Sequence, residues 1–249
     1  MFNFLRKVKR FLLKLKGYIF FPFILRSFIS FKSKDKSKRF SISFFDIFPC
    51  LFENIPYTSF DTHYVYHTAW AARKVNEINS DVHVDISSSL YFSSILSAFK
   101  KVKFYDFRPA KLNLSNLESS RANLLNLHFE DNSIDSLSCM HTVEHVGLGR
   151  YGDQIDPDGD IKAVKELSRV VSKGGSLLFV VPIGKPKIEF NAHRIYSYDM
   201  VINMFPDFSI KEFSLIPDNA LSSGMIYDAT KEDSDKQNHG CGCFWLIKN

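Results

Sequence analysis

The 249-residue sequence contains only four cysteines, Cys50, Cys139, Cys241 and Cys243. Four cysteines are too few, and too unevenly placed, to form a disulfide framework in a chain of this length. His239 lies close to the last two, but the segment lacks the C-x₂-C spacing and the second ligand pair of a structural zinc site. The cysteine content therefore predicts a cytoplasmic protein with no bound metal.

Acidic residues are scarce in the first 40 positions, which hold twelve lysines and arginines against one acid, Asp35. This segment has a net charge of +11, which leaves −6 for residues 41–249 out of the total of +5. A mildly acidic domain lacks the basic face that phosphate binding requires, so we do not expect nucleic acid as its main partner. The sequence also lacks a run of about 20 apolar residues that could cross a membrane, and no small-residue cleavage site indicates a signal peptide.

The first 40 residues form a basic arm with an apolar stripe. Five aliphatic residues recur at helical spacing: Leu5, Val8, Leu12, Leu15 and Ile19. A basic amphipathic helix binds the headgroup region of an anionic membrane, and it can equally pack on its own domain or in a homodimer. We expect residues 1–31 to make one of these contacts and residues 32–39 (KSKDKSKR) to be a solvated linker.

Residues 41–249 form one domain in which short apolar strands alternate with amphipathic helices. Helices are predicted over residues 58–78, 90–101 and 160–172, the last stopped by Gly174 and Gly175. Strands are predicted over 82–86, 102–106, 134–140, 176–181 (halted by Pro182), 208–215 and 241–247. This alternation predicts an α/β fold with a mostly parallel sheet covered on both faces. No helix is obvious between the last two strands, so we expect them to form an antiparallel hairpin.

This order of elements resembles the class I (Rossmann-like) S-adenosylmethionine-dependent methyltransferases over residues 82–249. The match lies in an acid followed by a small-residue turn (DISSS), an acid ending the second strand, and the segments DNSID, EH and LSRVVSKGGSLLFVVP. More narrowly, EHVGLGRYGD (144–153) and NAHRIY (191–196) resemble a bacterial methyltransferase-like family of unknown function, often encoded among surface-polysaccharide genes. The resemblance implies the Rossmann-like methyltransferase fold.

The resemblance also implies a binding site for S-adenosylmethionine. It assigns cofactor contacts to Asp85, Ser87, Ser89, Asp106, Asn123 and His141. Ser87 and Ser89 stand where the superfamily has glycines that let the backbone approach the cofactor. Asp106 matches the acid that accepts hydrogen bonds from the ribose hydroxyls. Asn123 lies near the position that binds the adenine. The structural alternatives are that Asp85 caps a helix and that Asp106 only ends a strand.

The catalytic side is expected in the two loops that follow the strands ending near residues 140 and 181, because ligands of this fold bind at the carboxyl ends of strands. These loops should face each other across the methyl donor. Transfer to a hydroxyl group requires a base, and His145 or His193 suits that task, with Glu144 nearby. The alternative for Glu144 and His145 is an acid–imidazole hydrogen bond that fixes the loop.

Two arginines in these loops, Arg150 and Arg194, are expected to hold an anionic or polyhydroxyl acceptor. Tyr151, Asp153 and Asn191 complete the expected acceptor site. The alternative for Arg150 is a salt bridge that braces the loop.

Together these features predict a methyltransferase that acts on a sugar or sugar-nucleotide intermediate of surface-polysaccharide synthesis, in the cytoplasm or peripherally at the inner membrane face. The alternative is a non-catalytic methyltransferase-like partner in a polysaccharide assembly complex. The replacement of the superfamily's glycines by Ser87 and Ser89 favours this alternative. An NAD-dependent oxidoreductase is disfavoured because no G-x-G-x-x-G follows the first strand.

Overall fold

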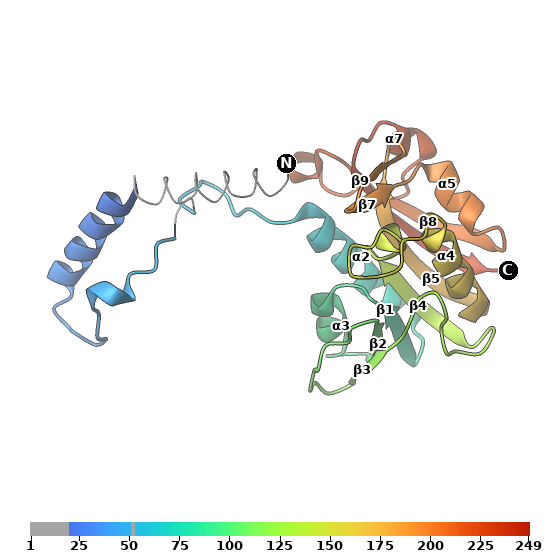
Figure 1. Cartoon of the computed structure of the whole chain (residues 1–249), viewed down its shortest axis with the longest axis horizontal. Helices are drawn as coiled ribbons and strands as arrows, with labels where there is room; N and C mark the ends of the chain where they lie inside the picture. The colour runs from blue at the N-terminus through green and yellow to red at the C-terminus, as the bar shows by residue number, and fades with distance from the viewer. Residues whose placement is uncertain (1–19, 51–52) are drawn as a thin grey trace. The chain divides into compact units, whose positions relative to one another are not determined.

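The computed structural model describes residues 20–50 and 53–249, which belong to two compact units, one ending at Ser59 and one spanning Phe60–Asn249 (Figure 1). In the first unit residues 20–34 are helical, and a short 3-10 helix, η1, spans Phe44–Asp46. The predicted amphipathic stripe over residues 5–19 lies outside the described residues. The predicted linker over 32–39 begins inside the helix, and the second unit starts at Phe60, whereas the predicted domain starts at residue 41.

The described part of the first unit exposes large apolar side chains. Phe23 is 73% exposed and Phe45 is 95% exposed. No helix in the described ranges is long and apolar enough to cross a membrane. Contact of residues 1–31 with an anionic membrane, or with a second copy of the chain, stays a prediction.

The second unit is built on a seven-stranded sheet with the strand order β3-β2-β1-β4-β5-β9-β8. The strands are β1 (Val82–Ile86), β2 (Lys101–Asp106), β3 (Leu117–Arg121), β4 (Ile134–Met140), β5 (Val171–Ile183), β8 (Phe208–Ile216) and β9 (Gly240–Lys248). The strands from β3 to β5 are parallel, and β9 pairs antiparallel with both β5 and β8. The predicted α/β architecture, with a mostly parallel sheet and an antiparallel C-terminal pair, is confirmed.

Helices cover both faces of this sheet. They are α2 (Thr62–Ile78), α3 (Leu90–Leu96), η2 (Val143–His145), α4 (Gly159–Val170), α5 (Tyr198–Met204), α6 (Ala220–Ser223) and α7 (Lys231–Asp235). Helices α2 and α3 pack on one face, and α4 and α5 pack on the other (Figure 1). Along β5, Leu177 and Phe179 join the core beneath α4 and α5, whereas Leu178 and Val180 join the other core. Burial on both faces explains why this strand is apolar at successive positions.

The C-terminal end of α4 differs from the prediction. The helix ends at Val170, and the residues that were expected to end it, Gly174 and Gly175, lie inside β5. The physical reason is strand pairing, because Val171 has an extended backbone and pairs with Ile134 at the start of β4. Pairing with a neighbouring strand therefore decides where this helix ends.

Several other elements differ from the sequence prediction. The strand expected to stop at Pro182 continues to Ile183, and the Pro182 carbonyl accepts a hydrogen bond from the Tyr196 amide at 3.0 Å. Strand β3 is missed because only one of its side chains, Leu117, is buried. The hairpin of β6 (Lys187–Glu189) and β7 (His193–Ile195) is also unexpected, as are α5, α6 and α7. These elements are too short to show a clear hydrophobic period.

A chain of buried polar side chains joins β1, β4 and α3. Asp85 is fully buried and accepts hydrogen bonds from the Ser138 hydroxyl at 2.5 Å and the Ser93 hydroxyl at 2.6 Å. Because Ser138 donates to Asp85, it accepts from His83 Nε2 at 2.9 Å, and His83 Nδ1 then accepts from Ser136 at 2.8 Å. Burial lowers the pKa of His83 to about 3 and raises the pKa of Asp85 to about 6.

The raised pKa of Asp85 predicts an unusual pH dependence of stability. A carboxyl group with a pKa of about 6 in the folded protein, against an ordinary value of 3.8, binds its proton more tightly in the folded state. Its contribution to the unfolding free energy is fully present below the ordinary pKa and is lost as the pH rises through 6. Asp85→Asn removes this dependence, so the variant should gain up to roughly 3 kcal/mol relative to the wild type between about pH 4 and pH 7. Urea unfolding across this range measures the difference, and a constant difference would contradict the prediction.

Candidate functional site

The carboxyl ends of β1, β2, β4 and β5 meet at one edge of the sheet, where ligands bind in open α/β folds. Two neighbouring strands end there in left-handed residues: Ser87 follows β1 with a φ of 55°, and His141 follows β4 with a φ of 53°. The Thr142 hydroxyl donates to the Ser87 carbonyl at 3.0 Å, and the Met140 amide donates to the Ser88 hydroxyl at 3.1 Å. These hydrogen bonds hold the two strand ends together.

Three of the expected cofactor residues lie around this edge. Ser87 takes the left-handed backbone that glycine favours, whereas Ser89 has a φ of −64° and is the N-cap of α3. Asp106 ends β2 and is half-buried, and its Oδ1 accepts a hydrogen bond from the Arg108 amide at 2.7 Å. Its other carboxylate oxygen has no hydrogen-bond partner among the described residues. This oxygen can accept hydrogen bonds from a ligand.

The other expected cofactor residues are engaged elsewhere. Asp85 presents no oxygen to a ligand, because it is buried and both oxygens accept from serine hydroxyls. It supports the fold in place of the expected cofactor contact. Asn123 is exposed in a turn after β3, where its side-chain oxygen accepts from the Leu125 amide at 3.1 Å. The His141 ring lies beside α2, in T-shaped contact with His67.

Glu144 in η2 is buried at the centre of the site, with 1% of its side chain exposed. Its Oε1 accepts a hydrogen bond from His141 Nδ1 at 2.9 Å, and His141 Nε2 lies 3.3 Å from Cys241 Sγ. Burial opposes a charge on His141, but the Cys241 sulfur and the Glu144 carboxylate raise its pKa. The acid–imidazole hydrogen bond expected between Glu144 and His145 does not form, because His141 is the imidazole that bonds to Glu144. His145 Nε2 lies 3.8 Å from the same Oε1, too far for a hydrogen bond.

The loops that follow β4 and β5 are adjacent, as predicted, but they hydrogen-bond to each other directly, whereas the prediction has them face each other across the methyl donor. The Ala192 carbonyl accepts hydrogen bonds from His145 Nδ1 at 2.7 Å and from Arg150 Nη1 at 3.0 Å. Because Nδ1 carries the proton, Nε2 of the neutral His145 ring is a free base. Burial lowers the pKa of His145 below its ordinary value of 6.5. The ring of His193 lies 6.5 Å from that of His145 and stacks on His239 at 4.9 Å.

Arg194 is buried beneath the loop after β4, with 5% of its surface exposed. Its Nη1 donates to the Val146 carbonyl at 2.7 Å, and its Nη2 donates to the Pro157 carbonyl at 3.1 Å. Its Nε lies 3.5 Å from Asp160 Oδ2. This burial is incompatible with the acceptor contact expected of Arg194, whose guanidinium positions the loop instead.

Asp153 also organises this loop. Its Oδ2 accepts from the amides of Gly147 at 2.9 Å and Gly149 at 3.3 Å, and its Oδ1 accepts from the Tyr151 amide at 3.1 Å. Burial opposes ionisation, but these amides hold the pKa of Asp153 below its usual value. Gly147 has a φ of +80°, and a Cβ there would lie 2.0 Å from the Asp156 carbonyl oxygen. The loop thus has a defined backbone shape.

Three expected acceptor residues remain exposed: Arg150, Tyr151 and Asn191. The guanidinium carbons of Arg108 and Arg150 lie 4.9 Å and 5.0 Å from the centre of the Tyr151 ring. Since the Arg108 amide bonds to Asp106, this ring brings the loop after β4 to the end of β2. The expected acceptor and cofactor residues are therefore neighbours here.

Helix α2 adds residues that the sequence prediction does not assign. His63 and His67 are one helical turn apart, with ring centres 5.6 Å and 5.0 Å from that of His141. Burial lowers the pKa of His63 to about 4 and that of His67 well below its ordinary value. The ligand atoms of His63, His141 and Cys241 all lie within 4.8 Å of one another. The H-x₃-H spacing within a predicted helix is the sequence feature that could identify this cluster.

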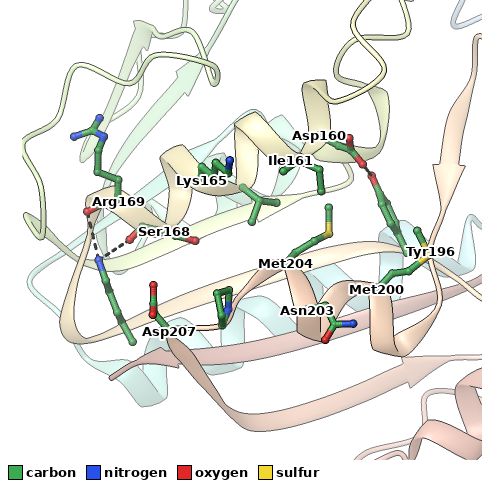
Figure 2. Close-up of a pocket in the computed structure, with 13 residues that line it drawn as sticks. Asp160, Ile161, Lys165, Ser168, Arg169, Tyr196, Met200, Asn203, Met204 and Asp207 are labelled. Atoms are coloured by element: carbon green, nitrogen blue, oxygen red, sulfur yellow. Dashed lines mark hydrogen bonds between the residues drawn. The ribbon is translucent and has the colours of Figure 1, made fainter.

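A surface pocket of about 640 Å³ lies away from this edge, between α4 and α5 (Figure 2). The Tyr196 hydroxyl donates to Asp160 at 3.0 Å at one side of the pocket. Met200 and Met204 contribute apolar surface from α5. The pocket does not include the strand ends or the histidines, so we do not place the cofactor in it.

Part of the chain matches a family model and a curated relative. Residues 113–232 match the model described as "Caenorhabditis protein of unknown function, DUF268". An uncharacterized protein of Methanocaldococcus jannaschii is 29% identical over 103 residues, which are 40% of this chain and 39% of that protein. The chain thus spans well under half the length of this curated relative.

Solved structures share the fold. The crystal structure of MccD protein has a TM-score of 0.50 and 14% identity, covering 72% of this chain and 96% of its own. A protein of Galdieria sulphuraria, described as a candidate sarcosine dimethylglycine methyltransferase, has a TM-score of 0.50 and 12% identity, covering 73% and 85%. The predicted Rossmann-like fold of the class I methyltransferases is confirmed by these similarities, which concern the fold alone.

The turn after β1 offers a matched pair of substitutions. Ser87 has a φ of 55°, which costs a residue with a Cβ about 1 kcal/mol, whereas Ser89 has an ordinary φ of −64°. Ser87→Gly relieves this strain but also adds freedom to the unfolded chain, so the two effects nearly cancel and the unfolding free energy should change by less than about 0.5 kcal/mol. Ser89→Gly should lower the unfolding free energy by about 0.5–1 kcal/mol, because it adds the same freedom to the unfolded chain and relieves no strain. Urea unfolding measures both, and equal destabilisation by the two substitutions would count against strain at Ser87.

Proposed function

We propose that this chain is an S-adenosylmethionine-dependent methyltransferase that binds its cofactor along the carboxyl ends of β1 and β2. The observation that carries the proposal is the proximity of the turn after β1 to the Asp106 carboxylate. The two strands are adjacent, Ile86 pairs with Tyr105, and the Ser87 amide donates to the Tyr105 carbonyl at 2.7 Å. A small-residue turn beside an acid at this edge is the arrangement that the resemblance implies.

The residues present fit this cofactor. The left-handed backbone of Ser87 supplies the turn that glycine would supply. The second oxygen of Asp106, with no hydrogen-bond partner in the described part of the chain, can accept from vicinal ribose hydroxyls. When bound, S-adenosylmethionine would supply the electrophilic methyl group. The protein would align the acceptor and receive its proton.

The acceptor in this proposal is a hydroxyl group of a sugar or sugar nucleotide, and His145 is the base. Its Nδ1 is occupied by the Ala192 carbonyl, so Nε2 is left to accept a proton. Arg150 is exposed beside this ring, and a guanidinium binds phosphate oxygens in a bidentate manner. Tyr151 provides an exposed aromatic face next to it. A role in surface-polysaccharide synthesis rests on the resemblance of the EHVGLGRYGD and NAHRIY segments.

One observation favours the alternative, a non-catalytic scaffold. Ser87 holds a left-handed conformation that glycine would adopt at lower cost. A protein that had lost cofactor binding could keep such a residue, because no ligand would need close approach to its backbone. Cofactor binding therefore separates the two functions.

Calorimetric titration of the full chain with S-adenosylmethionine and S-adenosylhomocysteine tests the proposal. We expect saturable binding that weakens by about 10- to 100-fold in Asp106→Ala, since hydrogen bonds to a charged group are lost. The matched control is Asp81→Ala, an exposed aspartate just before β1 at the opposite edge of the sheet, which should bind normally. If a folded wild-type sample shows neither binding heat nor thermal stabilisation, the methyltransferase proposal is refuted and the scaffold function is favoured. If Asp106→Ala binds the cofactor as tightly as the wild type, the assigned site is wrong.

The pH profile of methyl transfer tests His145. Because its pKa lies below 6.5, the ring is largely unprotonated at neutral pH, so kcat/KM should be flat at neutral and alkaline pH and fall on acidification. His145→Gln should lower kcat by about 10²- to 10⁴-fold while cofactor binding persists. His193→Gln, which changes the neighbouring ring, should have a smaller effect. A rate that keeps rising well above pH 7, or a larger loss in His193→Gln, would exclude His145 as the base.

A further inference from the structure

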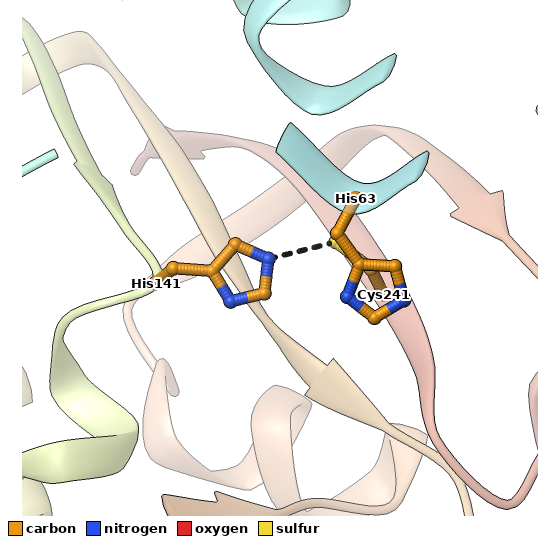
Figure 3. A group of neighbouring side chains, drawn as sticks. All are labelled: His63, His141 and Cys241. Atoms are coloured by element: carbon orange, nitrogen blue, oxygen red, sulfur yellow. Dashed lines mark hydrogen bonds between the residues drawn. The ribbon is translucent and has the colours of Figure 1, made fainter. Parts of the chain in front are cut away.

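Three potential metal ligands converge from distant parts of the chain (Figure 3). His63 comes from α2, His141 follows β4, and Cys241 lies in β9. Their ligand atoms all lie within 4.8 Å of one another, and His141 Nε2 is 3.3 Å from Cys241 Sγ. In a tetrahedral zinc site the nitrogen and sulfur ligands are about 3.5 Å apart, given Zn–N and Zn–S bonds of about 2.0 and 2.3 Å. The His141–Cys241 pair already has this separation, and His63 needs to move by only roughly 1 Å.

The His141 ring is held in the orientation that a metal requires. Its Nδ1 is bonded to Glu144 Oε1 at 2.9 Å, which directs Nε2 towards Cys241 and His63. Glu144 is 1% exposed, so water does not compete for this bond. Histidines that bind zinc commonly donate their second ring nitrogen to a carboxylate in this way.

His67 adds an independent observation. It lies one turn after His63, is fully buried, and its Nδ1 donates to the His63 carbonyl at 2.6 Å. Its Nε2 is buried with no hydrogen-bond partner among the residues described. A buried lone pair without a partner costs free energy, and a metal ion would satisfy it. The H-x₃-H spacing places both rings on one face of α2.

We propose that His63, His141 and Cys241 bind a structural Zn²⁺ ion that links α2, β4 and β9, and that His67 completes the coordination. His67 is not part of the group of ligand atoms within 4.8 Å, so its ring approaches the others when the metal binds. One sulfur and three imidazole nitrogens suit zinc, whereas magnesium and calcium prefer oxygen ligands. A simple hydrogen bond explains the His141–Cys241 contact alone. It explains neither the position of His63 nor the unpartnered nitrogen of His67. The inference departs from the metal-free protein that the cysteine spacing predicts, and it does not rest on the proposed methyltransferase function.

Titration of the chelator-treated full chain with Co²⁺, followed by competition with Zn²⁺, tests the site directly. We expect one equivalent of Co²⁺ to produce the visible bands of a tetrahedral complex and a thiolate-to-cobalt charge-transfer band. Zn²⁺ should displace Co²⁺ and raise the melting temperature, because it binds the folded state. Failure of the folded protein to take up either metal would overturn the proposal. The metal titration contains no S-adenosylmethionine, so a failure to bind metal is distinguishable from a failure to bind the methyl donor.

Variants identify the ligands. Cys241→Ser should remove the charge-transfer band and weaken zinc binding by more than about 100-fold, beyond the 10- to 100-fold typical of changes outside the ligand sphere. The matched control is Cys139→Ser, a buried thiol in β4 that belongs to the opposite core, which should bind normally. If Cys241→Ser does not fold, His63→Ala tests the site instead, because His63 is only half-buried and its loss should be tolerated by the fold. Unchanged zinc affinity in His63→Ala, or in a folded Cys241→Ser, would overturn the proposal.

Discussion

The hydrogen bond between the buried Glu144 carboxylate and His141 is the interaction on which the site depends. Burying a carboxylate is costly, and only Oε1 has a donor, which comes from the residue that follows β4; Oε2 has no hydrogen-bond partner among the described residues. The bond turns the other ring nitrogen of His141 towards Cys241, and it places the carboxylate beside His145. Arg194 then holds the same segment by donating to the Val146 carbonyl. Glu144 thereby orients the His141 ring within the histidine cluster, whereas the Ala192 carbonyl holds His145.

The sheet determines where this hydrogen bond lies relative to the proposed cofactor site. The left-handed residues Ser87 and His141 follow the neighbouring parallel strands β1 and β4. Ser87 lies in the proposed cofactor site, and the ring of His141 contacts α2. The loop after β4 joins the two regions, since Tyr151 packs with Arg108 while His145 bonds to Ala192. The fold alone does not fix the chemistry, because Rossmann-like sheets support many reactions. The proposed function therefore depends on the side chains at this edge of the sheet.

Histidine dominates that edge. Six of the eight histidines lie there, linked by successive ring contacts: His63, His67, His141, His145, His193 and His239. Burial lowers the pKa of His63, His67 and His145, which keeps their imidazoles neutral at pH 7. Neutral imidazoles act as bases and as metal ligands, and they avoid mutual repulsion at close range. Burial therefore suits His145 to act as a base and His63 and His67 to bind a metal. His141 has a raised pKa, so metal binding there must displace a proton.

The sequence by itself determined the layered fold, because the hydrophobic period of each element and the succession of elements along the chain can be read locally; the strands Val82–Ile86 and Ile134–Met140 have their predicted bounds. It also placed the two loops opposite each other, since the ends of parallel strands share one edge. Only the tertiary structure decided that Arg194 is buried, and that α4 ends where Val171 pairs with its neighbouring strand. It alone brought Cys241 to His63, because that contact needs β9 paired with β5 and α2 packed across them. Pairing between distant segments leaves no local pattern in the sequence.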